Sequence, residues 1–152
     1  MWKCYYVKYH QDFSTYFDGV CTHVRNGSFT DSKNYCVEEC FFKNLNNRAV
    51  YSSGDCNFLF EDSSFISVSS QSGAGGAVYT SKVEHVHNRI CSINCSTTSA
   101  AHYCFSWSSK GLNKNYIIES SISMSSKNPI GHEPLSFYRG IQYESILKSD
   151  FF

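Results

Sequence analysis

A chain of 152 residues is long enough for one domain with a sizeable core and too short for two domains of ordinary size. Its 13 Lys and Arg residues balance its 13 Asp and Glu residues, which argues against nucleic acid or an anionic membrane surface as the partner. Only 17% of the residues are charged while 16% are aromatic, a composition typical of strands and turns and unlike exposed helices or disordered linkers. No run of the sequence approaches the roughly 18 apolar residues that span a bilayer, and no export signal is visible in it.

The N-terminal segment 1–30 is rich in aromatic side chains, among them Trp2, Tyr5 and Phe13. It does not follow the repeat of the later chain, so we predict that residues 1–30 form an irregular N-terminal cap. Such a cap protects the open end of a stacked β-structure from pairing with other chains. A repeat domain is predicted over residues 31–152. Because its pattern stops in mid-coil, we expect a truncated C-terminus or a fragment of a longer β-helix protein.

Two sequence elements recur with one common period along this domain. The first occurs at residues 49–53, 77–82, 105–110 and 136–140, and its aromatic members Tyr51, Tyr79 and Trp107 are equally spaced. The second element occurs at residues 40–44, 64–68, 92–95 and 121–124, and its apolar members Phe65, Ile93 and Ile122 keep nearly the same spacing. Two elements that keep one period indicate a stack of repeating coils.

Within each coil apolar residues alternate with small polar ones, and the turn signals Gly54-Asp55 and 72–76 separate the runs. No helical pattern lies between the runs, which argues against a βαβ sheet. The sequence therefore predicts an all-β fold, a right-handed parallel β-helix (solenoid) of about four to five coils. The alternative is an all-β sandwich, in which consecutive strands would pair antiparallel.

Equivalent residues of stacked coils lie about 4.8 Å apart, so like side chains stack on like. Three ladders are predicted: an aromatic one of Tyr51, Tyr79 and Trp107, an apolar one of Phe41, Phe65, Ile93 and Ile122, and a hydroxyl one of Ser52, Thr80 and Ser108. Gly75 and Gly76 are expected to turn a corner with positive φ.

The motifs Gly75-Gly76-Ala77-Val78 and Phe41-Phe42-Lys43-Asn44 resemble the paired repeat motifs of polymorphic outer-membrane-protein repeats. Similar cysteine-bearing coils occur in protist surface proteins of the pectate-lyase-like β-helix class. The resemblance covers roughly residues 36–140 and implies an extended, adhesive domain at the cell surface or outside the cell. The second pair of glycines is missing before Ala49-Val50, and no signal peptide is visible.

The eight cysteines allow three interpretations. Cys36 and Cys40, like Cys91 and Cys95, would lie about 13 Å apart within one strand, too far for a disulfide or a shared zinc ion. We rank buried core thiols first, disulfides between coils second and metal ligation third.

His85 and His87 would point to one face of a strand, as paired metal ligands do, but no third ligand is evident nearby. A surface or turn position is the preferred interpretation for these histidines. No metal-ligating, cofactor-binding or catalytic residue is assigned, and no cofactor is expected.

Glycoside hydrolysis needs two carboxylates across one groove. The adjacent pairs Glu38-Glu39 and Glu61-Asp62 would point to opposite faces of a strand, and Gly131-His132-Glu133 is only a fragment of a polygalacturonase signature. The preferred function is therefore a non-catalytic surface or interaction module with a protein or glycan ligand. The alternative is a degenerate carbohydrate-active β-helix enzyme, which would place several charged side chains on one sheet.

Overall fold

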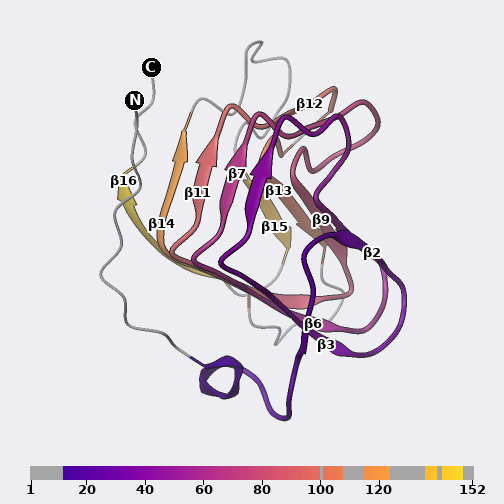
Figure 1. Ribbon diagram of the computed structural model, residues 1–152, viewed down its shortest axis with the longest axis vertical. Coiled ribbons are helices and arrows are strands. Elements are labelled where there is room, and N and C mark those ends of the chain that lie inside the picture. The colour runs from indigo at the N-terminus through magenta and orange to yellow at the C-terminus, as the bar shows by residue number, and fades with distance from the viewer. Residues whose placement is uncertain (1–11, 100, 108–114, 124–135, 140–141, 149–152) are drawn as a thin grey trace.

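In the computed structural model the chain forms a parallel β-solenoid of about three turns, seen in Figure 1 as arrows stacked in layers. The structure describes residues 12–99, 101–107 and 115–123, together with the backbone of two strands at 136–139 and 142–148. The predicted all-β parallel β-helix is confirmed. One short 3-10 helix, η1 (Phe13–Thr15), precedes the strands.

The strands of the described residues are, in chain order, β1 (Thr22–His23), β2 (Gly27–Phe29), β3 (Asn34–Glu38), β4 (Phe41–Lys43), β5 (Val50–Ser52), β6 (Asn57–Glu61), β7 (Ser64–Ile66), β8 (Ser69–Ser70), β9 (Val78–Ser81), β10 (Glu84–Asn88), β11 (Cys91–Ile93), β12 (Ser96–Thr97), β13 (Cys104–Trp107), β14 (Asn115–Ser123), β15 (Ser136–Arg139) and β16 (Gln142–Lys148).

Three parallel faces enclose the core. The first is the five-stranded sheet β2-β5-β9-β13-β15, in which the strands lie side by side in the order in which the chain forms them. The second runs β1-β3-β6-β10-β14, with β16 paired to β14. The third runs β4-β7-β11 and also ends on β14, because residues 115–118 of that long strand pair with β10 while residues 121–123 pair with β11. Every pairing among the described strands is parallel, so the sandwich alternative is wrong.

The second face is buried on both sides, although alternation predicted strands that bury one side. Phe13 and Phe17 of the N-terminal segment cover its outer side, where they form a small apolar cluster with Cys36, Leu59 and Val86. The N-terminal segment thus packs over a sheet side that would otherwise expose apolar residues. The first strand of the five-stranded sheet begins at Gly27, a few residues before the expected start of the repeat domain at residue 31, and that boundary stays a prediction.

The aromatic ladder differs from the prediction in one member. The register places Tyr51 opposite Tyr79 and Tyr79 opposite Phe105, whereas Trp107 lies opposite Ser81. The coil from Tyr79 to Phe105 is shorter than the coil from Tyr51 to Tyr79, so a constant period selects the wrong residue. The buried hydroxyl ladder likewise continues from Thr80 to Ser106, and the predicted Ser108 lies outside the described residues.

The apolar ladder is wrong in two members. The observed register is Phe42, Phe65, Ser92 and Ile122, whose members are unevenly spaced along the chain. A slip of one residue moves a strand side chain to the opposite face. Phe41 is therefore 64% exposed, while Phe42 stacks on Phe65 with ring centroids 4.8 Å apart.

Gly75 and Gly76 serve different purposes. Gly75 has a φ of 76°, as predicted for a corner, but Gly76 does not adopt positive φ. A Cβ atom added to Gly76 would lie 2.0 Å from the His102 carbonyl oxygen and 2.5 Å from that of Ser96. The close approach of two backbones is therefore what requires glycine at this position.

We expect Gly76→Ala to lower the free energy of unfolding by about 2–3 kcal/mol, because the neighbouring carbonyls belong to the backbone and must move. Urea unfolding followed by circular dichroism measures this change. Gly73→Ala is the matched control for added bulk, since its nearest neighbour within 4 Å is the flexible end of Arg48 at 3.3 Å. Because Gly73 has a φ of 66°, its substitution costs about 1 kcal/mol through backbone strain alone. Equal losses of unfolding free energy in Gly76→Ala and Gly73→Ala would contradict the conclusion that the close backbone approach requires glycine at residue 76.

Candidate functional site

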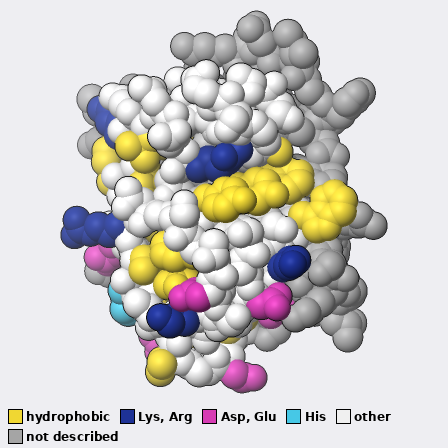
Figure 2. Space-filling model, turned by 90° about the vertical axis from the view of Figure 1, so that its right-hand side faces the viewer, with side chains coloured by type: hydrophobic (Ala, Val, Ile, Leu, Met, Phe, Trp, Pro, Cys, Tyr) yellow, Lys and Arg dark blue, Asp and Glu magenta, His cyan; other side chains and the backbone are white. Residues whose placement is uncertain are grey.

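A row of aromatic side chains crosses the outer side of the five-stranded sheet. Tyr51, Tyr79 and Phe105 come from adjacent strands, with ring centroids 4.9 and 5.2 Å apart and planes within 10°. In-register parallel pairing produces this stack, because equivalent residues of successive coils point the same way. Figure 2 shows the row of hydrophobic side chains across this side of the molecule. The rings are half-buried and cover one another's faces, so mainly their edges meet solvent.

Trp107 extends the row. It lies two residues after Phe105 on the same side of β13 and is 41% exposed. The residue opposite it on β9 is the small Ser81. An exposed tryptophan beside an ordered aromatic stack is a large apolar surface held on rigid strands.

Arg48 fixes a positive charge beside the row. Its guanidinium carbon lies 5.4 Å from the Tyr79 ring centroid and 6.0 Å from that of Tyr51. The guanidinium donates hydrogen bonds to the carbonyl oxygens of the turn at residues 72–75, including one of 2.8 Å to Gly75. Burial lowers the pKa of Arg48 from its usual value without removing its charge. No carboxylate of the described residues lies within salt-bridge distance of it.

We call Arg48, Tyr51, Tyr79, Phe105 and Trp107 the aromatic face. The sequence singled out both tyrosines and Trp107, but it missed the other two members. Phe105 was missed because its coil is shorter than the period. Arg48 lies in a turn, and only the fold brings its side chain to the rings.

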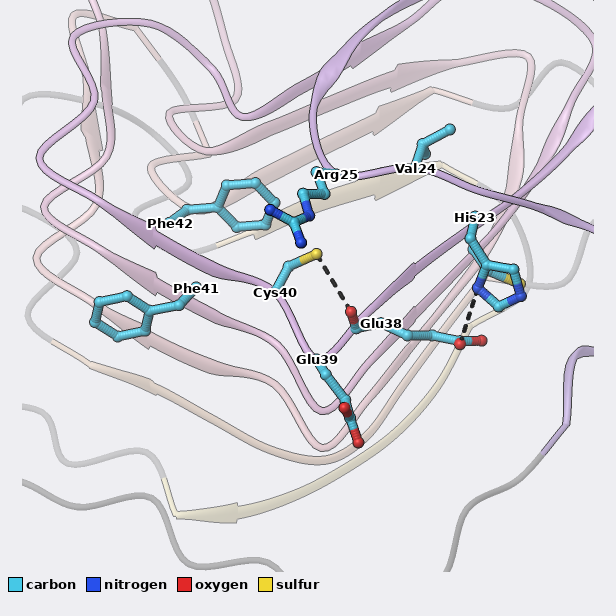
Figure 3. Close-up of a pocket in the computed structure, with 9 residues that line it drawn as sticks. His23, Val24, Arg25, Glu38, Glu39, Cys40, Phe41 and Phe42 are labelled. Atoms are coloured by element: carbon cyan, nitrogen blue, oxygen red, sulfur yellow. Dashed lines mark hydrogen bonds and ion pairs between the residues drawn. The ribbon is translucent and has the colours of Figure 1, made fainter.

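A second feature is a hollow of about 570 Å³ at the N-terminal end of the stack. It is drawn in Figure 3 and is lined by His23, Val24, Arg25, Cys36, Glu38, Glu39, Cys40, Phe41 and Phe42. The Cys40 thiol donates a hydrogen bond of 3.3 Å to the Glu38 carbonyl oxygen. Burial raises the pKa of this thiol, so it remains protonated at neutral pH and is poorly suited to nucleophilic catalysis.

The carboxylates of Glu61 and Asp62 do not point to opposite faces, contrary to the prediction. Asp62 has a φ of 47°, which breaks the strand alternation at the corner, and both carboxylates bind Arg89 at 2.7 Å. Glu61 also accepts a hydrogen bond from Asn88. Both carboxylates are thus committed to one cation, and this argues against their use as the acid and base of a hydrolase.

His85 and His87 share one face of β10, as predicted, but the preferred surface position is wrong. Both are fully buried in the solenoid. His87 Nδ1 lies 2.8 Å from the Tyr103 hydroxyl, and its ring stacks on Phe60 with centroids 4.4 Å apart. Burial lowers the pKa of His85 to about 3, and it lowers that of His87 as well. On the neighbouring strands His87 lies between Phe60 and Ile117, and His85 lies between Phe58 and the buried Asn115. Both rings are therefore neutral members of the core.

The described cysteines include both buried core thiols and disulfides, the first two of the three interpretations. Free thiols at Cys56, Cys95 and Cys104 are buried in the core. Cys21 and Cys36 form a disulfide that ties the N-terminal segment to β3, and Cys91 is also disulfide-bonded. As predicted, Cys36 is not bonded to Cys40 and Cys91 is not bonded to Cys95.

No family model, curated protein or solved structure matches the chain. The parallel β-helix is therefore supported by the strand pairing alone. The finer resemblance to pectate-lyase-like or outer-membrane repeats is supported only by the sequence motifs. Among the described residues, no helix is long and apolar enough to cross a membrane.

Proposed function

We propose that the protein is a non-catalytic interaction module that binds a protein partner through the aromatic face. The observation that carries the proposal is the exposed Trp107 beside a rigid stack of three aromatic rings and a preorganised Arg48. Tryptophan, tyrosine and arginine are the residues enriched where binding energy concentrates at protein interfaces. The resemblance to repeats of cell-surface proteins implies a role of the same kind, an adhesive one.

The ring geometry favours a protein over a glycan as the partner. Sugars stack on the free faces of aromatic rings, but the faces of Tyr79 are covered by its neighbours at 4.9 and 5.2 Å. The aromatic face offers the ring edges of Tyr51, Tyr79 and Phe105, extended by the exposed Trp107, with the Arg48 cation beside the stack. Its complement is a partner surface with aliphatic or aromatic side chains and a carboxylate that meets Arg48.

Selection of a displayed random-peptide library on the immobilised protein tests the proposal. We expect peptides that combine aromatic or aliphatic residues with Asp or Glu. Their affinity should fall about 30-fold in Trp107→Ser, the loss typical of a hot-spot residue. Phe41→Ser is the matched control, because Phe41 is also an exposed aromatic residue but lies on the third face, at β4.

Two results would contradict the proposal. One is a selection that yields no peptide sensitive to Trp107→Ser. The other is binding of an oligosaccharide array that Trp107→Ser abolishes, with no peptide bound, which would show that the aromatic face takes a glycan ligand. Circular dichroism of each variant shows whether its fold is retained.

A further inference from the structure

We infer that reduction of the Cys21–Cys36 disulfide creates a binding site for a thiophilic divalent metal ion such as Zn²⁺. The inference rests on a cluster outside the aromatic face. The two sulfur atoms and a carboxylate oxygen of Glu38 all lie within 4.8 Å of one another. His23 Nδ1 lies 3.1 Å from Glu38 Oε2, an interaction drawn as a dashed line in Figure 3.

The strand register explains why these four residues meet. β1 pairs parallel with β3 so that His23 lies opposite Cys36. Cys36 and Glu38 are two residues apart on β3 and therefore share its outer side. Cys21 immediately precedes β1, and the disulfide holds its Cα atom 5.7 Å from that of Cys36. Two short strands thus gather donors that come from two separate stretches of the sequence.

The donor set suits zinc. Zinc takes four ligands in a tetrahedron, with bonds of about 2.3 Å to thiolate sulfur and about 2.0–2.2 Å to imidazole nitrogen or carboxylate oxygen. Such a tetrahedron separates its two sulfurs by about 3.8 Å and its nitrogen and oxygen by about 3.4 Å. The Nδ1–Oε2 distance of 3.1 Å is already close to this value. Cys21, Cys36 and Glu38 are three ligands, and His23, whose side chain is 71% exposed, turns to supply the fourth.

A dithiol serves as the reductant of the Cys21–Cys36 disulfide. Two electrons from the dithiol break the Cys21–Cys36 bond, the dithiol becomes a disulfide, and its two protons pass to the cysteine sulfurs. Binding of Zn²⁺ then forms two sulfur–zinc bonds and releases these two protons to solvent. In an oxidising compartment the same residues remain a covalent clamp between the N-terminal segment and β3.

The neighbouring thiol does not compete for this position. Cys40 lines the same hollow, but its Sγ atom donates to the Glu38 main-chain carbonyl and belongs to no described donor cluster. His23, Cys36 and Glu38 line the hollow as well, so three of the four donors lie at its edge.

Titration of the full chain with Co²⁺ as a spectroscopic stand-in for Zn²⁺ tests the inference. The reduced protein should bind one equivalent, with thiolate-to-cobalt charge transfer and the visible bands of a tetrahedral site, and the oxidised protein should show neither. Cys21→Ser should lose this signal, whereas the matched control Cys40→Ser should keep it. Glu38→Gln and His23→Ala should keep some charge transfer but bind at least about 10- to 100-fold more weakly, the range found when a group that only supports a metal ligand is removed.

Wild-type protein in its two redox states is compared on one chain, so the test does not depend on a variant folding. Absence of cobalt–thiolate bands in the reduced wild type would overturn the inference. Equal signals in Cys21→Ser and the wild type, or loss of the signal in Cys40→Ser, would overturn it as well, because the ion would then be bound by other thiols.

Discussion

Acidification from pH 7 to pH 5 should lower the free energy of unfolding by about 4 kcal/mol, because the unfolded chain gains two protons that the folded chain excludes. His85 and His87 are buried among aromatic rings, and burial lowers the pKa of His85 to about 3 and the pKa of His87 well below its usual value. In the unfolded chain both titrate near pH 6.5.

The lowered pKa values of the two histidines determine the direction in which stability changes with pH. Above pH 6.5 the two histidines are neutral in both states and contribute no pH dependence. Below pH 6.5 the unfolded state binds more protons, so stability falls as the pH falls, at up to about 1.4 kcal/mol per histidine and pH unit. This loss continues down to the folded pKa of about 3 for His85. His102 is also buried with a lowered pKa and adds to the effect in the same direction.

Urea unfolding at a series of pH values measures the dependence. His85→Phe continues a ladder in which Phe58 is the neighbour on β6, and it removes one titrating group. It should reduce the loss between pH 7 and 5 by about 2 kcal/mol. A slope in His85→Phe equal to that of the wild type would show that other groups cause the acid sensitivity.

Arg89→Met should lower the free energy of unfolding by about 3–5 kcal/mol, the cost of leaving a buried charge without its partner. The Arg89 side chain is only 3% exposed and Glu61 is fully buried. Arg89 is held by Asp62 through two hydrogen bonds of 2.7 and 2.9 Å and by Glu61 through one of 2.7 Å. These bonds raise the pKa of Arg89 further above its already high value, so the cation is permanent.

The same corner provides the internal test. Adding Glu61→Gln to Arg89→Met removes the uncompensated carboxylate and should restore part of the lost stability, which a double-mutant cycle measures. Lys33→Met is the matched control, because Lys33 and Asp31 form an exposed pair at 3.6 Å that is worth about 1 kcal/mol or less. A loss below about 1 kcal/mol in Arg89→Met would mean that solvent reaches Glu61 in the unperturbed protein.

The repeat class could be predicted from the sequence because two elements kept nearly one period. Alternation within each element indicated strands, and the absence of helical patterns left stacking as the way to bury them. Tyr51 and Tyr79, one period apart in the sequence, do stack as predicted. Gly75 turns its corner with positive φ for the reason that its residue type suggests.

Only the tertiary structure decided the register, because the coils differ in length and a single slip exchanges the core and solvent faces. Phe105 therefore takes the place predicted for Trp107, and Phe42 the place predicted for Phe41. The same dependence on neighbouring coils placed His85 and His87 in the core and brought Arg89 to Glu61. Local sequence determines which residues form strands, whereas the coil above and below determines what each side chain meets.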